Sequence, residues 1–202
     1  MKKHFSLASY LSTTLKYLGA ACLLTLASCT NVVSKKPVGE TAAHLDPKDW
    51  NGAWAVSNGQ SIHVCVKATD PSVLEVGWVD IKDGALQFQK LDVHVSEAGG
   101  WLWASFREKQ DQPYTIARIS AAGDHFLAWT LLAEPLAQAV KSGALKGEIQ
   151  TKNEGKDHGP RESKDILLDT LTDKQLMSLK EGKYGEVFDW GKPVMVLTRL
   201  KE

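Results

Sequence analysis

The chain has 202 residues, and its 24 basic residues (Lys and Arg) balance its 24 acidic ones, giving a formal net charge of 0 at pH 7. A neutral chain lacks the basic stripe that binds nucleic acids, so the composition argues against a nucleic-acid partner and against electrostatic attachment to membranes. The length is that of one domain, long enough to bury roughly 70% of the surface of the unfolded chain.

The first 28 residues have the features of an export signal. They contain three lysines and no acidic residue, and their most apolar part runs from residue 17 to residue 27. This run is too short to span about 30 Å of hydrocarbon, which takes about 20 apolar residues. The pattern therefore predicts a signal peptide over residues 1–28 rather than a transmembrane helix.

The signal ends in Leu26-Ala27-Ser28-Cys29, which resembles the lipobox of bacterial lipoprotein precursors. The resemblance implies that Cys29 receives diacylglycerol, that the signal is cut just before it, and that the new amine is acylated. Two or more acyl chains hold a protein stably on a membrane. In that family Thr30, in place of Asp, implies the periplasmic face of the outer membrane in a cell with two membranes. The alternative is an ordinary signal peptide with a chance cysteine.

The next segment is predicted to connect the anchor to a folded domain. Residues 29–48 have little periodicity and two prolines, so we expect a lipidated N-terminus and a flexible tether with a reach of about 25 Å. The alternative is an ordered lead-in that covers one end of the domain. A single β-rich globular domain is expected over residues 49–202. Only Cys29 and Cys65 remain after cleavage, and lipidation uses the first, so no internal disulfide is expected.

Seven short runs of alternating polarity follow, separated by turns rich in Asn, Asp and Gly. Short strands on tight turns predict an antiparallel meander, which can close into a barrel or fold as a sandwich. Asp83-Gly84 is a strong hairpin signal, and a change of apolar parity after Phe88 predicts a bulge near Gln89-Lys90. The runs cover residues 52–56, 61–68, 73–82, 85–95, 101–108, 114–120 and 125–132.

In the C-terminal third of the chain, the spacing of apolar residues no longer follows the alternation of a strand. A short helix is predicted over residues 134–143, with Pro135 in its first turn and Gly143 as its stop. A second short helix follows Thr172, which forms a capping box with Gln175. Two short strands are expected at 145–150 and 166–169 and a last one at 193–200, while the charged segment 151–165 is expected to be an exposed loop. The predicted fold class is mainly β, with two short helices in the C-terminal half.

Gly52-Ala53-Trp54, on the first predicted strand of the meander, resembles the G-x-W of lipocalins and related calycins. The resemblance implies a barrel in which Trp54 closes one end beneath an arginine of the last strand, a role open to Arg199. The order of the meander, the A-x-x-x-G-x-L-x-G of residues 139–147 and the closing V-L-x-R-L also resemble uncharacterised bacterial lipoproteins. That group brings no assigned activity.

Two pairs of side chains have the residue types of a catalytic site. His63 and Cys65 share a strand face, about 6–7 Å apart along the chain, as a base and nucleophile or half of a metal site would. The alternative is a free thiol packed under its neighbours. Asp92 and His94 also share a face, where a carboxylate can orient an imidazole. The sequence has no metal-binding or nucleotide-binding motif, and we predict neither a metal nor a cofactor.

The tryptophans offer a different kind of site. All seven lie after residue 49, and Trp101 and Trp103 share one face of a strand whose other face is also apolar. They are either structural, beneath the two helices, or part of a ligand cavity or partner surface. In the second interpretation the candidate binding surface consists of Trp101, Trp103, His63 and Cys65.

The sequence therefore predicts a lipid-anchored, non-catalytic protein of the cell envelope that binds a small apolar ligand or an envelope protein. One alternative is a hydrolase or thiol enzyme that uses His63 and Cys65, or Asp92 and His94. Another is a purely structural or assembly-accessory lipoprotein of the envelope.

Overall fold

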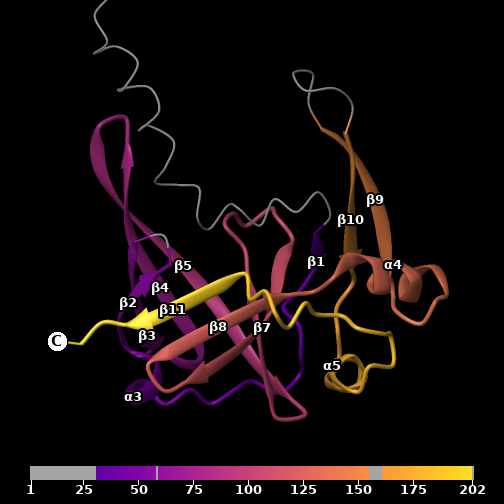
Figure 1. The fold of residues 1–202 in the computed structure, drawn as a ribbon, viewed down its shortest axis with the longest axis horizontal. Helices are drawn as coiled ribbons and strands as arrows, with labels where there is room; N and C mark the ends of the chain where they lie inside the picture. The colour runs from indigo at the N-terminus through magenta and orange to yellow at the C-terminus, as the bar shows by residue number, and fades with distance from the viewer. Residues whose placement is uncertain (1–30, 58, 155–160, 202) are drawn as a thin grey trace, which may run out of the picture.

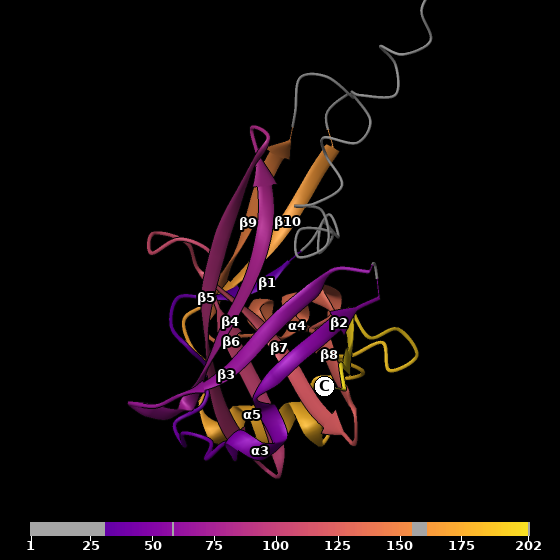
Figure 2. The ribbon, with the colours of Figure 1, turned by 90° about the vertical axis from the view of Figure 1, so that its left-hand side faces the viewer.

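The structure is a computed structural model that describes residues 31–57, 59–154 and 161–201. The predicted signal peptide and Cys29 lie outside the described residues. Strands make up about half of the described residues, and eight of them form a closed antiparallel barrel that is accompanied by three short helices (Figures 1 and 2). The prediction of a mainly β, lipocalin-like barrel is confirmed.

The barrel strands follow the predicted meander. They pair in the order β6-β5-β4-β3-β2-β11-β8-β7, and the pairing of β6 with β7 closes the ring. Each of the seven predicted runs forms one strand, and β11 is the predicted last strand, inserted between β2 and β8. The bounds are β2 (Gly52–Val56), β3 (Ser61–Lys67), β4 (Asp70–Lys82), β5 (Ala85–Ala98), β6 (Trp101–Phe106), β7 (Tyr114–Ala122), β8 (His125–Thr130) and β11 (Met195–Arg199).

Three further strands extend the sheet beyond the barrel. β1 (Val32–Ser34) pairs antiparallel with the start of β7 and parallel with β10 (Arg161–Leu168), which pairs antiparallel with β9 (Gly147–Glu154). The prediction of an exposed loop over residues 151–165 is therefore wrong, because its described ends continue β9 and β10. A charged segment lacks the alternation of apolar residues that reveals a half-buried strand, and here the backbone pairing holds the hairpin.

Residues 31–48 belong to the folded domain, so the prediction of a flexible tether is wrong for this part of the chain. Val32, Val38 and Leu45 are only 6%, 2% and 2% exposed. The segment crosses one end of the barrel and leads into α3 (Pro47–Trp50), whose Trp50 joins the core inside the barrel. This arrangement agrees with the alternative prediction, in which the segment is ordered and covers one end of the barrel.

Two buried serines fix the backbone of this segment at Val38. The hydroxyl of Ser105 accepts a hydrogen bond from the Val38 N–H at 3.0 Å, and the hydroxyl of Ser96 donates to the Val38 carbonyl at 2.7 Å. Because buried backbone groups must be paired, the two serines allow Val38 to be buried without an adjacent strand.

The two predicted helices of the C-terminal half are confirmed as α4 (Ala133–Lys141) and α5 (Asp173–Lys180). The Thr172–Gln175 capping box begins α5. Both helices cover a core on the outside of the barrel, in which Trp103, Leu136 and Leu176 are 0% exposed. No helix in the described part of the chain is long and apolar enough to cross a membrane.

The β4–β5 hairpin is regular up to its turn at Asp83-Gly84, where both residues have positive φ (54° and 80°). The register is unbroken from Val73 opposite His94 to Lys82 opposite Ala85, so the predicted bulge near Gln89-Lys90 is wrong. The apolar parity of β5 changes for another reason. Leu91, Val93 and Val95 contribute to the barrel interior, whereas the earlier part of the strand lies in a projecting hairpin.

Candidate ligand cavity

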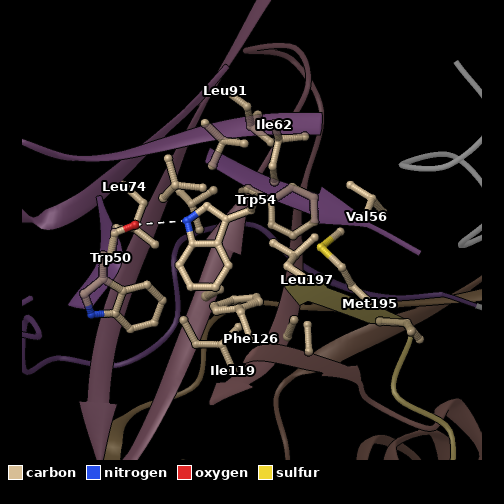
Figure 3. A pocket seen from close by; sticks show the side chains of 18 of the residues that line it. Trp50, Trp54, Val56, Ile62, Leu74, Leu91, Ile119, Phe126, Met195 and Leu197 are labelled. Carbon is tan, nitrogen blue, oxygen red and sulfur yellow. Dashed lines mark hydrogen bonds between the residues drawn. The ribbon is translucent and has the colours of Figure 1, made fainter. Parts of the chain in front are cut away.

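The barrel interior contains a cavity of about 210 Å³ (Figure 3). Inward-facing side chains of all eight barrel strands line it, together with Trp50 of α3 and Val194. Among the described residues of the lining, Gln60 and Thr130 are the polar ones, and none has a formal charge. The wall is therefore suited to an apolar ligand.

Small residues on three neighbouring strands leave this space open. Ala104 of β6 lies directly opposite Ala117 of β7, and Ala128 of β8 lies opposite Ile119. All four side chains line the cavity and are at most 6% exposed. A barrel of eight strands has an interior that side chains can fill, and alanines at facing positions leave part of it empty.

Aromatic side chains close one end of the cavity. Trp54, which is 2% exposed, donates a hydrogen bond from Nε1 to the carbonyl oxygen of Trp50 at 3.2 Å (Figure 3). Phe126 meets the rings of Trp50 and Trp54 edge to face, with centroid distances of 5.5 and 6.5 Å. The three aromatic rings thus form the floor of the cavity at the end covered by α3.

Arg199 lies over the outside of this floor. Its guanidinium carbon is 4.8 Å from the centroid of the Trp54 ring. Its Nη1 donates to the carbonyl oxygen of Lys48 at 3.0 Å, and its Nη2 donates to that of Asp49. The last strand and α3 are thereby joined across the tryptophan, the arrangement that the G-x-W resemblance implied for Gly52, Trp54 and Arg199.

The opposite end of the cavity is open. Val56, Phe106, Thr130 and Met195 line it there and are partly exposed, and Val194 is 45% exposed. Both polar residues of the lining lie at this end: Gln60 directly precedes β3, and Thr130 is the last residue of β8. The cavity is therefore a pocket with one apolar floor and one mouth with hydrogen-bonding groups.

Trp101 and Trp103 do not line this cavity. Trp103 is 0% exposed in the core outside the barrel, and Trp101 packs at its edge, 5.5 Å from Trp190 and 6.0 Å from Phe188 between ring centroids. Trp103 therefore has the role that the structural interpretation gave it, and neither tryptophan belongs to the cavity inside the barrel. The helices α4 and α5 and the segment around Phe188 cover this face of β6. The sequence showed that the face is apolar, but not which elements cover it.

The rings of Trp101, Trp129 and Trp190 form an aromatic cluster on the outside of the barrel, and the side chain of Arg118 lies among them. The guanidinium carbon of Arg118 is 4.8 Å from the rings of Trp101 and Trp129 and 5.2 Å from that of Trp190. Burial lowers the pKa of Arg118 below its usual value. Arginine stacks readily on aromatic faces, so we assign Arg118 a packing role in this cluster.

His63 and Cys65 lie on the outer face of β3, whereas Ile62 and Val64 on its inner face line the cavity. The Cys65 sulfur is 3.4 Å from His63 Nδ1, His63 is exposed and Cys65 is partly exposed. The two side chains are brought together, but on an open surface outside the cavity. Their assignment to the same binding surface as the tryptophans is therefore wrong.

Asp92 and His94 do not form the predicted pair in this structure. The Asp92 carboxylate accepts a hydrogen bond from Lys67 Nζ at 2.6 Å, which raises the pKa of Lys67. The His94 ring packs edge to face on Tyr114, with a centroid distance of 6.1 Å. In the described part of the chain, no group of three or more His, Cys, Asp or Glu side chains could hold a metal ion.

The sequence pointed to a ligand cavity as one interpretation but did not identify the residues that line it, although a signal for them was present. Ala104, Ala117 and Ala128 stand at inward positions of three consecutive runs, beside larger inward residues such as Phe106, Ile119 and Phe126. A comparison of the chain with protein-family models, with curated proteins and with solved structures found no match.

Proposed function

We propose that this chain is a lipid-anchored protein of the cell envelope whose barrel binds a small apolar ligand. The observation that supports the ligand is the cavity of about 210 Å³, which is apolar, closed at Trp54 and open at the opposite end. Binding there is non-catalytic in this account, because the pairs with catalytic residue types lie outside the cavity.

The volume and the lining restrict the ligand. An apolar cavity of about 150 Å³ in another protein stays dry and binds benzene. A somewhat larger space suits a single substituted ring or a short alkyl chain, and it is too small for a sterol. A polar end of such a molecule would remain at the mouth, near Thr130 and Gln60, because burying it among the apolar side chains would cost free energy.

A fluorescence titration tests the ligand. Trp54 lies in the floor, so we expect single-ring and short-chain apolar compounds to change the tryptophan emission of the mature Cys29→Ala chain saturably. Ala117→Leu fills the cavity and should weaken binding by more than about tenfold. Ala122→Leu, the same change at an exposed position of the same strand, should leave it unchanged. Equal binding by both variants, or no saturable change across the panel, would overturn the proposal.

The anchor is supported by the lipobox Leu26-Ala27-Ser28-Cys29, and Thr30 favours the periplasmic face of an outer membrane. Growth of cells with radiolabelled palmitate tests this part separately. We expect label in the wild-type chain and none in Cys29→Ala. An unlabelled wild-type chain would overturn the anchor and leave the ligand proposal standing.

A further inference from the structure

The projecting end of the β4–β5 hairpin has an exposed apolar face. Val79 lies directly opposite Phe88, and Ile81 lies opposite Leu86, so the four side chains form one continuous surface, here called the arm face. They are 54%, 71%, 67% and 75% exposed in that order. Contiguous exposed apolar residues of this kind mark interaction sites on soluble domains.

The projecting end of the hairpin, here called the arm, is ordered and has two different faces. A Cβ atom on Gly77 would lie only 2.8 Å from Phe88 Cζ, which shows that the Phe88 ring rests on the glycine backbone. The face opposite the arm face includes Asp80, Lys82 and Gln87. The hairpin is therefore amphipathic, and the Phe88 ring is packed against its backbone.

The arm rises from the rim of the cavity mouth. Pairing of β4 with β3 ends at Gly77, opposite His63, and pairing of β5 with β6 begins at Val93, opposite Phe106. Phe106 lines the mouth, and the start of β3 adjoins Gln60, which also lines it. Among the residues that the structure describes, those from Trp78 to Gln89 form strand pairs only with one another.

The chain enters the domain on the side toward which the arm points. In Figures 1 and 2 the β4–β5 and β9–β10 hairpins project in the same direction, away from α3 and α5. β1 runs parallel to β10, with Val32 opposite Ile166, so Asn31 lies on the side of Val32 that faces the projecting end of β10. The Cα of Cys29 lies within about 7 Å of that of Asn31, since two peptide units separate them.

We propose that the arm face is buried in the surface of the bilayer that holds the lipidated Cys29. This inference rests on the proposed lipidation. Because the anchor is so close to β1, it holds against the bilayer the side of the domain from which the β4–β5 and β9–β10 hairpins project. The chain is folded from residue 31 onward, so no long flexible linker allows the domain to rotate away from the membrane. Apolar side chains at the membrane interface bind by burying apolar surface area, which requires no net positive charge on the protein. The cavity mouth then opens toward the bilayer, from which an apolar ligand can partition.

A depth measurement tests the arm in the full lipidated protein, reconstituted in vesicles of phosphatidylethanolamine and phosphatidylglycerol. On a Cys65→Ser background, Leu86→Cys places a label on the arm face. Gln87→Cys places the same label on the next residue, which is exposed on the opposite face. We expect lipids with nitroxide-labelled chains to quench the fluorophore at position 86 several-fold more strongly than the one at position 87, and aqueous iodide to show the reverse order.

Equal quenching by lipid at the two positions would overturn the inference. So would protection of position 86 that depends on protein density and not on lipid, since that result would assign the face to contact between copies. Palmitate incorporation and ligand titration are measured on the same preparations. Lost lipid contact at position 86 with intact lipidation and ligand binding would refute the arm alone, whereas an unlabelled chain would refute the anchor.

Discussion

Arg199 and Trp54 are direct cross-strand partners of β11 and β2, and the guanidinium of the first lies 4.8 Å from the ring centroid of the second. This contact joins the last strand to the first strand of the meander, at the end where α3 covers the barrel. The floor of the cavity therefore depends on residues that are far apart in the sequence.

Removal of the guanidinium should destabilise the closed end. We expect Arg199→Ala to lower the free energy of unfolding by about 2 kcal/mol, because a cation–π contact and hydrogen bonds to two carbonyl oxygens are lost. Lys201→Ala removes an ion pair with Asp124 that is largely exposed, and it should cost less than about 1 kcal/mol. Urea denaturation of the two variants measures the difference, and equal costs would contradict the role of Arg199.

The docking of the N-terminal segment can be tested at Gly39. Its φ is +82°, and a Cβ atom there would lie 2.3 Å from the Ser96 hydroxyl that binds Val38. We expect Gly39→Ala to cost more than about 2 kcal/mol, from backbone strain together with crowding. Gly123→Ala is the control, since its φ is +59° and nothing lies within 4 Å of the added methyl. Similar melting temperatures for both variants would show that the segment is not held as described.

The ion pair between Lys35 and Asp169 makes this docking sensitive to acid. The hydrogen bond from Lys35, at 2.8 Å, lowers the pKa of Asp169 below 3.8. A carboxyl whose pKa is lowered by folding adds stability above its unfolded pKa and loses it as the pH falls through the folded value. We therefore expect Asp169→Asn to show a smaller loss of stability than the wild type between pH 6 and pH 3. An unchanged loss in urea titrations would count against this contact.

Ligand affinity should not depend on pH or salt. The described lining has no charged side chain, and His63 and His94 lie outside the cavity. We expect one dissociation constant between about pH 5 and pH 8, the range in which histidine ordinarily changes its charge. A dissociation constant that changes severalfold over this range would place a titrating group against the ligand and contradict the site.

Cys65 should have no role in binding. Its side chain is on the outer face of β3, so we expect Cys65→Ser to leave both ligand affinity and melting temperature unchanged. The wild-type thiol should react with a maleimide no faster than a simple alkyl thiol does. A much faster reaction that is lost in His63→Gln would support the thiol-enzyme alternative instead.

The strands of the meander could be predicted because each has a local signal. Alternating polarity marks β2 to β8, and turn residues such as Asp83-Gly84 fix where one strand ends and the next begins. The same holds for α5, whose capping box is contained in four residues. Signals of this kind need no knowledge of the rest of the fold.

The parts that could not be predicted depend on distant partners. Val38 is buried because Ser105, 67 residues away, satisfies its N–H, and β1 is a strand because it pairs with β7 and β10. The cavity depends on which alanines face one another across β6 and β7, which is known only from the register. The two tryptophans of β6 appeared available for binding because the helices that cover them come later in the chain.

A crystal structure of the mature domain with bound bromobenzene would show whether the barrel interior holds a ligand. If the barrel is a ligand pocket, the anomalous signal of bromine will lie inside it, between the floor at Trp54 and Phe126 and the mouth at Met195. A barrel without this signal, in which Trp54 and Met195 have closed over the space beside Ala117, would contradict a ligand pocket.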